Sequence, residues 1–158
     1  MRLILIALLL IATPAYASEV ETQQDAVLAC LSKMDTDTSW AECRSMLFEP
    51  CAEETVGSES HLTCLASEKK AWQGEMDLRR DLLNEKLTTN GSAMMTDLLG
   101  QWFGYVANKC QAVADEKAGI SSEAAFAGCE ISEIAGITLD FETCLKGNST
   151  SPYCIHKE

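Results

Sequence analysis

Eight cysteines are the residues of this 158-residue chain that are best suited to chemistry. No two of them have the C-x-x-C spacing of thioredoxin-like redox sites and zinc knuckles. An even number of cysteines in an exported chain instead favours four structural disulfides. They are Cys30, Cys43, Cys51, Cys64, Cys110, Cys129, Cys144 and Cys154.

The spacing of the cysteines predicts that neighbours in the sequence pair. Cys110 and Cys129 flank a turn at Gly119, and residues equally far from such a turn come level in an antiparallel helical hairpin. Cys51 or Cys154 could instead reach across to another helix. The expected pairs are Cys30–Cys43, Cys51–Cys64, Cys110–Cys129 and Cys144–Cys154.

The remaining reactive side chains do not form a recognisable catalytic or metal site. His61 and His156 are the only histidines, and neither stands near a suitable nucleophile. Met76, Met94 and Met95 could bind Cu(I), but methionines at helical spacing more often fill a core. We therefore expect a protein that is not an enzyme, with no catalytic residue, metal or cofactor.

The first 17 residues have the pattern of a secretory signal peptide. Arg2 is followed by an apolar run from Leu3 to Ile11 and by an A-x-A site that predicts cleavage between Ala17 and Ser18. The expected mature protein is one domain, residues 18–158, without stable membrane insertion. The pattern predicts a periplasmic or secreted location.

The mature chain is strongly acidic. The full sequence has a net charge of −12, and removal of the signal, which carries only Arg2, leaves −13. Residues 18–60 hold ten acidic and two basic side chains, a net −8. Such a surface disfavours nucleic acid and would speed encounter with a cationic partner. The candidate interaction face is Asp35, Asp37, Glu53 and Glu54, and the alternative is acidity that serves solubility alone.

Apolar residues recur at helical rather than strand spacing throughout the chain. The uncharged run at 98–108 is too short to cross a bilayer, which needs about 20 apolar residues. We expect the helix around it, with Trp102 and Tyr105 on the inner face, to be the most buried. The fold class is an all-α, disulfide-stapled bundle of three long and two short helices, at about 21–33, 39–48, 59–87, 92–117 and 122–145.

Capping residues and apolar stripes supply the details of these helices. Ser18 and Ser39 open capping boxes, Asn90-Gly91 suits a left-handed cap, and Ser121 or Ser122 begins the last helix. In the first long helix we expect Leu62, Leu65, Trp72, Met76, Leu83 and Leu87 to point inward. Its charged residues should mainly face solvent; they are Glu68, Lys69, Lys70, Glu75, Asp77, Arg79, Arg80 and Asp81.

Three motifs resemble those of a known family. Glu68-x-x-x-Trp72 follows Cys64-Leu65, Trp102-x-x-Tyr105 precedes Cys110, and Gly119 is followed by Cys129 and by Glu133-Ile134-Ala135. This pattern, over about residues 28–145, resembles the N-terminal domain of LprI-type lysozyme inhibitors, which are small exported cysteine-rich helical proteins. The resemblance implies a helical fold and inhibition of a cationic lysozyme-type muramidase.

The sequence also departs from the family pattern. Val106-Ala107 stands where the family has Arg-Asp, Gly136 replaces an Arg, and Leu87 replaces a Tyr. A buried Arg–Asp network would then be replaced by small apolar residues, which keeps a fold but alters a polar site. We expect an exported interaction protein that inhibits lysozyme; the alternative is a periplasmic envelope or assembly factor without lysozyme affinity.

Overall fold

The computed structural model describes residues 16–33, 48–117, 120–147 and 154, apart from the side chains of 16–23, 33 and 50. These residues form α-helices and contain no strand, so the all-α prediction is confirmed. The helices are α1 (Tyr16–Lys33), α3 (Glu59–Asn84), α4 (Thr89–Glu116) and α5 (Ser122–Leu145), together with the short 3₁₀ helix η1 (Glu49–Cys51).

The predicted count of five helices is wrong for the described part of the chain, which holds four α-helices. The fifth, the short helix expected at 39–48, lies outside the described residues except for Phe48. Phe48 itself has a φ of 67°, in the left-handed region. A bulky residue with that backbone cannot continue an α-helix.

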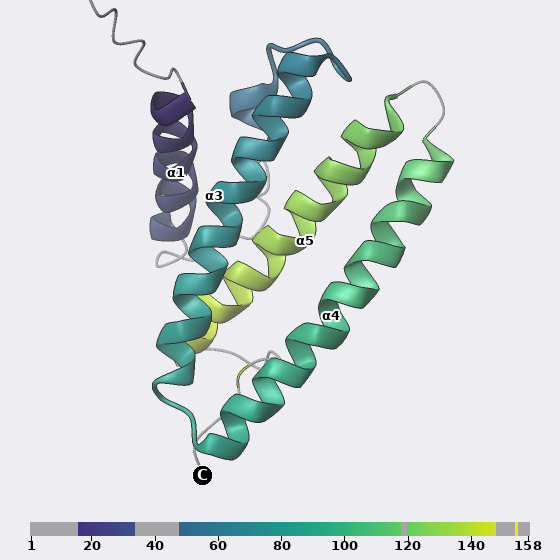
Figure 1. Ribbon diagram of the computed structural model, residues 1–158. Coiled ribbons are helices and arrows are strands. Elements are labelled where there is room, and N and C mark those ends of the chain that lie inside the picture. Colours follow the sequence, from purple (N-terminus) through teal and green to yellow (C-terminus); the bar gives the residue numbers. More distant parts are fainter. Residues whose placement is uncertain (1–15, 34–47, 118–119, 148–153, 155–158) are drawn as a thin grey trace, which may run out of the picture.

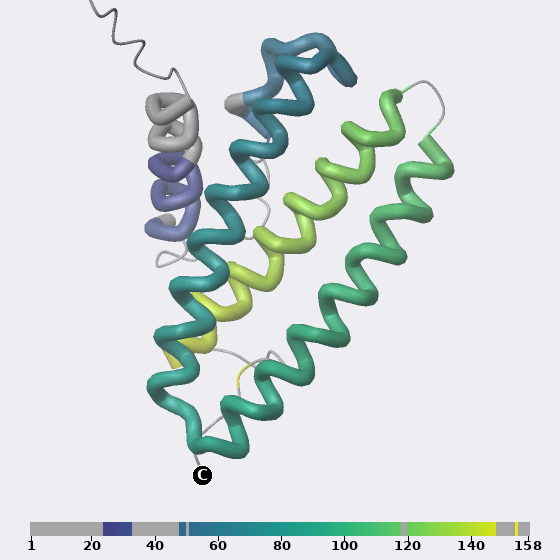
Figure 2. Tube along the Cα trace, viewed as in Figure 1, coloured from purple at the N-terminus to yellow at the C-terminus, as the bar shows by residue number. Residues whose placement is uncertain are grey.

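Helix α5 lies between α3 and α4, and α1 packs against α3 (Figure 1). The trace in Figure 2 shows α3 and α4 joined at a tight turn at one end and diverging toward the other. Because α3 and α4 have few contacts with each other, α5 supplies most of the surface that both of them bury. The core therefore lies along α5.

The prediction that the helix at 94–110 is the most buried is wrong. No side chain of α5 from Ala124 to Leu145 is exposed, whereas Tyr105 in α4 is 58% exposed and Phe103 is 44% exposed. An apolar helix becomes buried all round only where neighbours cover every side. Helix α4 has one main neighbour, so only one of its faces is covered, and Trp102 is half-buried.

The turn between α3 and α4 comes earlier than the sequence suggested. Helix α3 ends at Asn84, and Thr88 caps α4 by accepting a hydrogen bond from the Gly91 N–H at 3.2 Å. A Cβ at Gly91 would come within 3.2 Å of the Leu87 Cβ, so the turn uses this glycine for close packing. The predicted left-handed cap at Asn90-Gly91 is therefore wrong, since both residues are helical.

Helix α1 begins at Tyr16, before the predicted capping box at Ser18. Ser18 therefore lies within the helix, because Tyr16 and Ala17 before it are helical as well. Residues 1–15 lie outside the described part, so the signal peptide and its cleavage after Ala17 stay predictions. No helix among the described residues is long and apolar enough to span a membrane.

Candidate functional site

Three predicted disulfides are confirmed. The Cα atoms are 5.8 Å apart in Cys51–Cys64, 5.4 Å apart in Cys110–Cys129 and 5.1 Å apart in Cys144–Cys154. Cys51–Cys64 joins η1 to the start of α3, and Cys110–Cys129 joins the end of α4 to the start of α5. Two disulfides therefore lie at the end of the bundle where α3 and α4 diverge.

Cys30 is also disulfide-bonded, and it is 1% exposed within α1. Its predicted partner, Cys43, lies outside the described residues. Disulfides of this kind are typical of proteins in oxidising compartments. They fit the predicted export of the chain.

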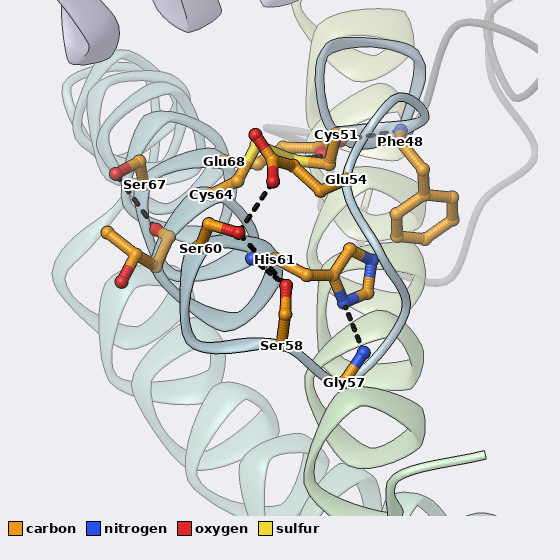
Figure 3. Close-up of a disulfide and its surroundings, with 11 residues drawn as sticks. Phe48, Cys51, Glu54, Gly57, Ser58, Ser60, His61, Cys64, Ser67 and Glu68 are labelled. Atoms are coloured by element: carbon orange, nitrogen blue, oxygen red, sulfur yellow. Dashed lines mark hydrogen bonds between the residues drawn. A yellow bond between two sulfur atoms is a disulfide. The ribbon is translucent and has the colours of Figure 1, made fainter.

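Glu68 holds the turn that precedes the Cys51–Cys64 disulfide (Figure 3). Its carboxylate accepts the Phe48 N–H at 3.0 Å and is only 3% exposed. Burial raises the pKa of Glu68 above its usual range, while hydrogen bonds from Phe48 and Trp72 act in the opposite direction. The carboxylate thus fixes the backbone of Phe48, which is strained by its positive φ.

The loop of residues 52–58 is fixed against two helices. Gly57, at φ +80°, approaches α5 so closely that a Cβ there would lie 2.7 Å from the Ser121 Cβ. The Gly57 N–H donates to His61 Nδ1 at 3.3 Å, and Ser58 caps α3 by accepting the His61 N–H at 3.1 Å. The loop is therefore held against α3 and α5 by contacts at its C-terminal end (Figure 3).

Serine, histidine and glutamate side chains meet in this loop, but not as a catalytic triad. Ser60 Oγ donates to Glu54 Oε2 at 2.6 Å, while the His61 imidazole accepts from the Gly57 backbone. A nucleophilic serine needs its hydroxyl hydrogen-bonded to the base. In this loop the imidazole is bonded to backbone, so the geometry shapes the loop rather than activating a hydroxyl.

An open groove of about 520 Å³ lies between this loop and the ends of α4 and α5. Its lining is mainly apolar, and Val56 and Ile120 are 59% and 45% exposed there. The ionisable side chains in the lining are His61 and Lys117, and no acidic side chain is among them. The lining residues are Phe48, Val56, His61, Leu65, Val113, Lys117, Ile120, Ala124, Ala125, Gly128, Cys129 and Ser132.

Five exposed acidic side chains lie on the loop at 52–58, at the end of α4 and at the start of α5, segments that contribute to the groove lining, although none of the five is itself a lining residue. None of them forms an ion pair with another described residue. Glu53 and Glu54 belong to the predicted interaction face, whereas Asp35 and Asp37 of that face lie outside the described residues. We call this set the rim acids: Glu53, Glu54, Asp115, Glu116 and Glu123.

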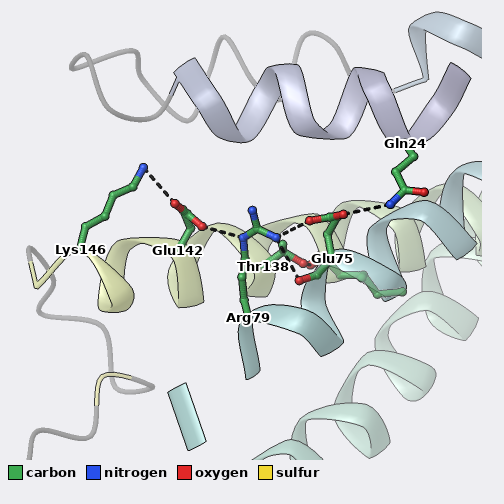
Figure 4. Close-up of polar contacts among 7 residues, drawn as sticks. Gln24, Glu75, Arg79, Thr138, Glu142 and Lys146 are labelled. Atoms are coloured by element: carbon green, nitrogen blue, oxygen red, sulfur yellow. Dashed lines mark hydrogen bonds and ion pairs between the residues drawn. The ribbon is translucent and has the colours of Figure 1, made fainter. Parts of the chain in front are cut away.

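A buried ion-pair network links three helices farther along α3 (Figure 4). Arg79 Nε donates to Glu142 Oε2 at 2.7 Å, and Arg79 Nη1 donates to Glu75 Oε2. Gln24 of α1 donates to Glu75 at 3.3 Å, and Lys146 lies 3.0 Å from Glu142. The network fastens α1 and α5 to α3.

The prediction that the charges of α3 mainly face solvent is wrong for Glu68, Glu75 and Arg79. Their exposed fractions are 3%, 3% and 8%. All three recur at three- or four-residue steps with the buried Trp72 and Met76, so they share the inward face of the helix. That spacing was the sequence signal for their burial.

The methionines do not gather into a copper site in the described part of the chain. Met76 and Met95 are buried in the core at 3% and 1% exposure, whereas Met94 is 56% exposed. No group of three His, Cys, Asp or Glu side chains is placed to hold a metal ion within the described ranges.

The described residues define a small, all-α, disulfide-stapled protein with a mainly apolar groove. Comparison of the chain with family models, with curated proteins and with solved structures finds no match. The resemblance to LprI-type lysozyme inhibitors therefore stays a prediction from the sequence motifs.

Proposed function

We propose that this is an exported, non-enzymatic interaction protein that binds a cationic partner, with a lysozyme-type muramidase as the first candidate. The observation that carries the proposal is the set of rim acids, which are exposed on segments that line a preformed groove and form no ion pair with another described residue. Unpaired surface charge raises the rate of encounter with an oppositely charged protein. The motif resemblance supplies the identity of the candidate.

Inhibition of peptidoglycan hydrolysis tests this proposal. The purified mature protein is titrated into a c-type lysozyme with a peptidoglycan substrate, and an equally acidic, unrelated helical protein is the control. We expect the protein to reduce activity at micromolar concentration and the control to leave it unchanged. Full activity at micromolar excess would remove lysozyme as the target.

The second candidate function is an envelope or assembly factor without lysozyme affinity. The same rim acids and groove support it, because they favour a basic protein partner without selecting an enzyme. Affinity capture from periplasmic extract, followed by mass spectrometry, separates the two candidates. A captured muramidase supports inhibition, whereas a captured envelope protein supports the alternative.

A further inference from the structure

We propose that the groove receives an apolar side chain that projects from a loop of the cationic partner protein. This inference rests on the proposed function and assigns the part of the surface that performs it. It places the centre of the interface between the loop at 52–58 and the ends of α4 and α5, and not in the acidic residues alone.

The groove is built before any partner arrives. Cys51–Cys64 fixes one wall and Cys110–Cys129 fixes the other. The close approach of Gly57 to Ser121 sets the position of the loop against α5. A preformed pocket lowers the entropy lost when a partner side chain enters it.

Two exposed aliphatic side chains identify the part of the groove where contact with a partner would be most favourable. Val56 and Ile120 extend from separate segments into the same groove and remain 59% and 45% exposed. Phe48 lies beside them, with its ring 3.7 Å from the position of a Cβ on Gly128. Covering these side chains with an apolar group removes apolar surface from water on both partners.

The charged residues in and near the groove favour an apolar side chain, rather than a basic one, inside it. A basic side chain inside the groove would meet Lys117, which forms no ion pair with a described residue and lies in the lining. The rim acids instead lie on the bordering segments, where basic residues that flank the inserted group would meet them. An apolar centre within a charged rim is the usual anatomy of a protein interface.

The test compares two matched double variants of the full mature protein. Val56→Ser with Ile120→Ser removes exposed apolar surface from the groove. Leu78→Ser with Leu82→Ser removes similar surface from α3, where the two leucines are 52% and 41% exposed. Binding to a c-type lysozyme is measured by titration calorimetry, with circular dichroism to confirm that each variant folds.

We expect the groove variant to bind at least about tenfold more weakly and the control within about twofold of the unchanged protein. The loss should persist at high salt, because it comes from apolar contact rather than from charge. Ala125→Leu should also weaken binding, since it fills the groove without making it polar.

Three results would overturn the inference. If wild type binds lysozyme and the groove variant binds equally well, the groove is not the contact, although the proposed function stands. If wild type does not bind, the lysozyme proposal and this inference fail together. If the free protein forms a dimer that the groove variant abolishes, the groove belongs to a second copy of the chain.

Discussion

Two sets of charged side chains in the bundle differ in their exposure and in their pairing. At the end that carries Cys51–Cys64 and Cys110–Cys129, the disulfide end, the rim acids are exposed and form no ion pair with another described residue. Toward the other end, the ion-pair end, Arg79 joins Glu75 and Glu142 between helices with little exposure to solvent. Paired, buried charge fastens elements together, whereas unpaired, exposed charge remains available to a partner.

The largest effect expected from this comparison concerns the ion-pair end. Arg79→Leu leaves Glu75 and Glu142 without their shared partner, and we expect the free energy of unfolding to fall by about 3 kcal/mol. The matched control is Arg80→Leu, whose ion pairs with Asp77 and Asp81 are exposed and should cost less than about 1 kcal/mol. Urea unfolding measures both variants. Equal losses in the free energy of unfolding for the two variants would mean that the buried network does not hold the helices together.

The next largest effect concerns the contribution of the Cys110–Cys129 disulfide to stability. Replacing Cys110 and Cys129 with serine frees a loop closed over 19 residues, and we expect a loss of about 3 kcal/mol. Replacing Cys144 and Cys154 frees a loop closed over 10 residues and should cost less. Thermal and urea unfolding of the two double variants rank them. A larger loss in the free energy of unfolding from the Cys144/Cys154 variant would contradict the expectation that Cys110–Cys129 contributes more to stability.

A smaller effect concerns the pH dependence that Glu68 gives to the disulfide end. Burial raises its folded pKa above the usual value of 4.5, so the folded state binds the proton more tightly than the unfolded state. Stability from this group is therefore complete below pH 4.5 and decreases as pH rises through the folded pKa. We expect Glu68→Gln to flatten this decrease in urea unfolding between pH 4 and pH 7. An unchanged slope would exclude Glu68 as its source.

The fold was largely predictable because helix formation and local disulfides leave short-range signals. Apolar spacing predicted the three long helices, and symmetry about Gly119 predicted Cys110–Cys129. The relative burial of the helices was not predictable in this way. The uncharged run of α4 is apolar whether one neighbour or several cover it, and only the three-dimensional arrangement places α5 at the centre.

The candidate site was predictable only in part. Glu53 and Glu54 were expected at an interaction face; both are exposed on the loop at 52–58, whose Val56 lines the groove, and their role at an interface stays a prediction. The groove itself depends on contacts between distant segments, such as Gly57 with Ser121 and Phe48 with Glu68. Contacts between such distant segments cannot be predicted from the spacing of residues in the sequence. The burial of Glu75 and Arg79, by contrast, could have been read from their place on the apolar stripe of α3.

The central claim is that the rim acids attract the partner, and association kinetics test it most directly. Glu53→Gln with Glu54→Gln neutralises two rim acids, while Glu85→Gln with Asp97→Asn neutralises two exposed acids on other segments that also form no ion pair with a described residue. Association rates with a c-type lysozyme are measured at low and physiological salt. The account predicts that the first pair lowers the low-salt rate by about threefold and flattens its salt dependence, whereas the second pair changes neither. Equal changes from both pairs, or no change from the first, would contradict it.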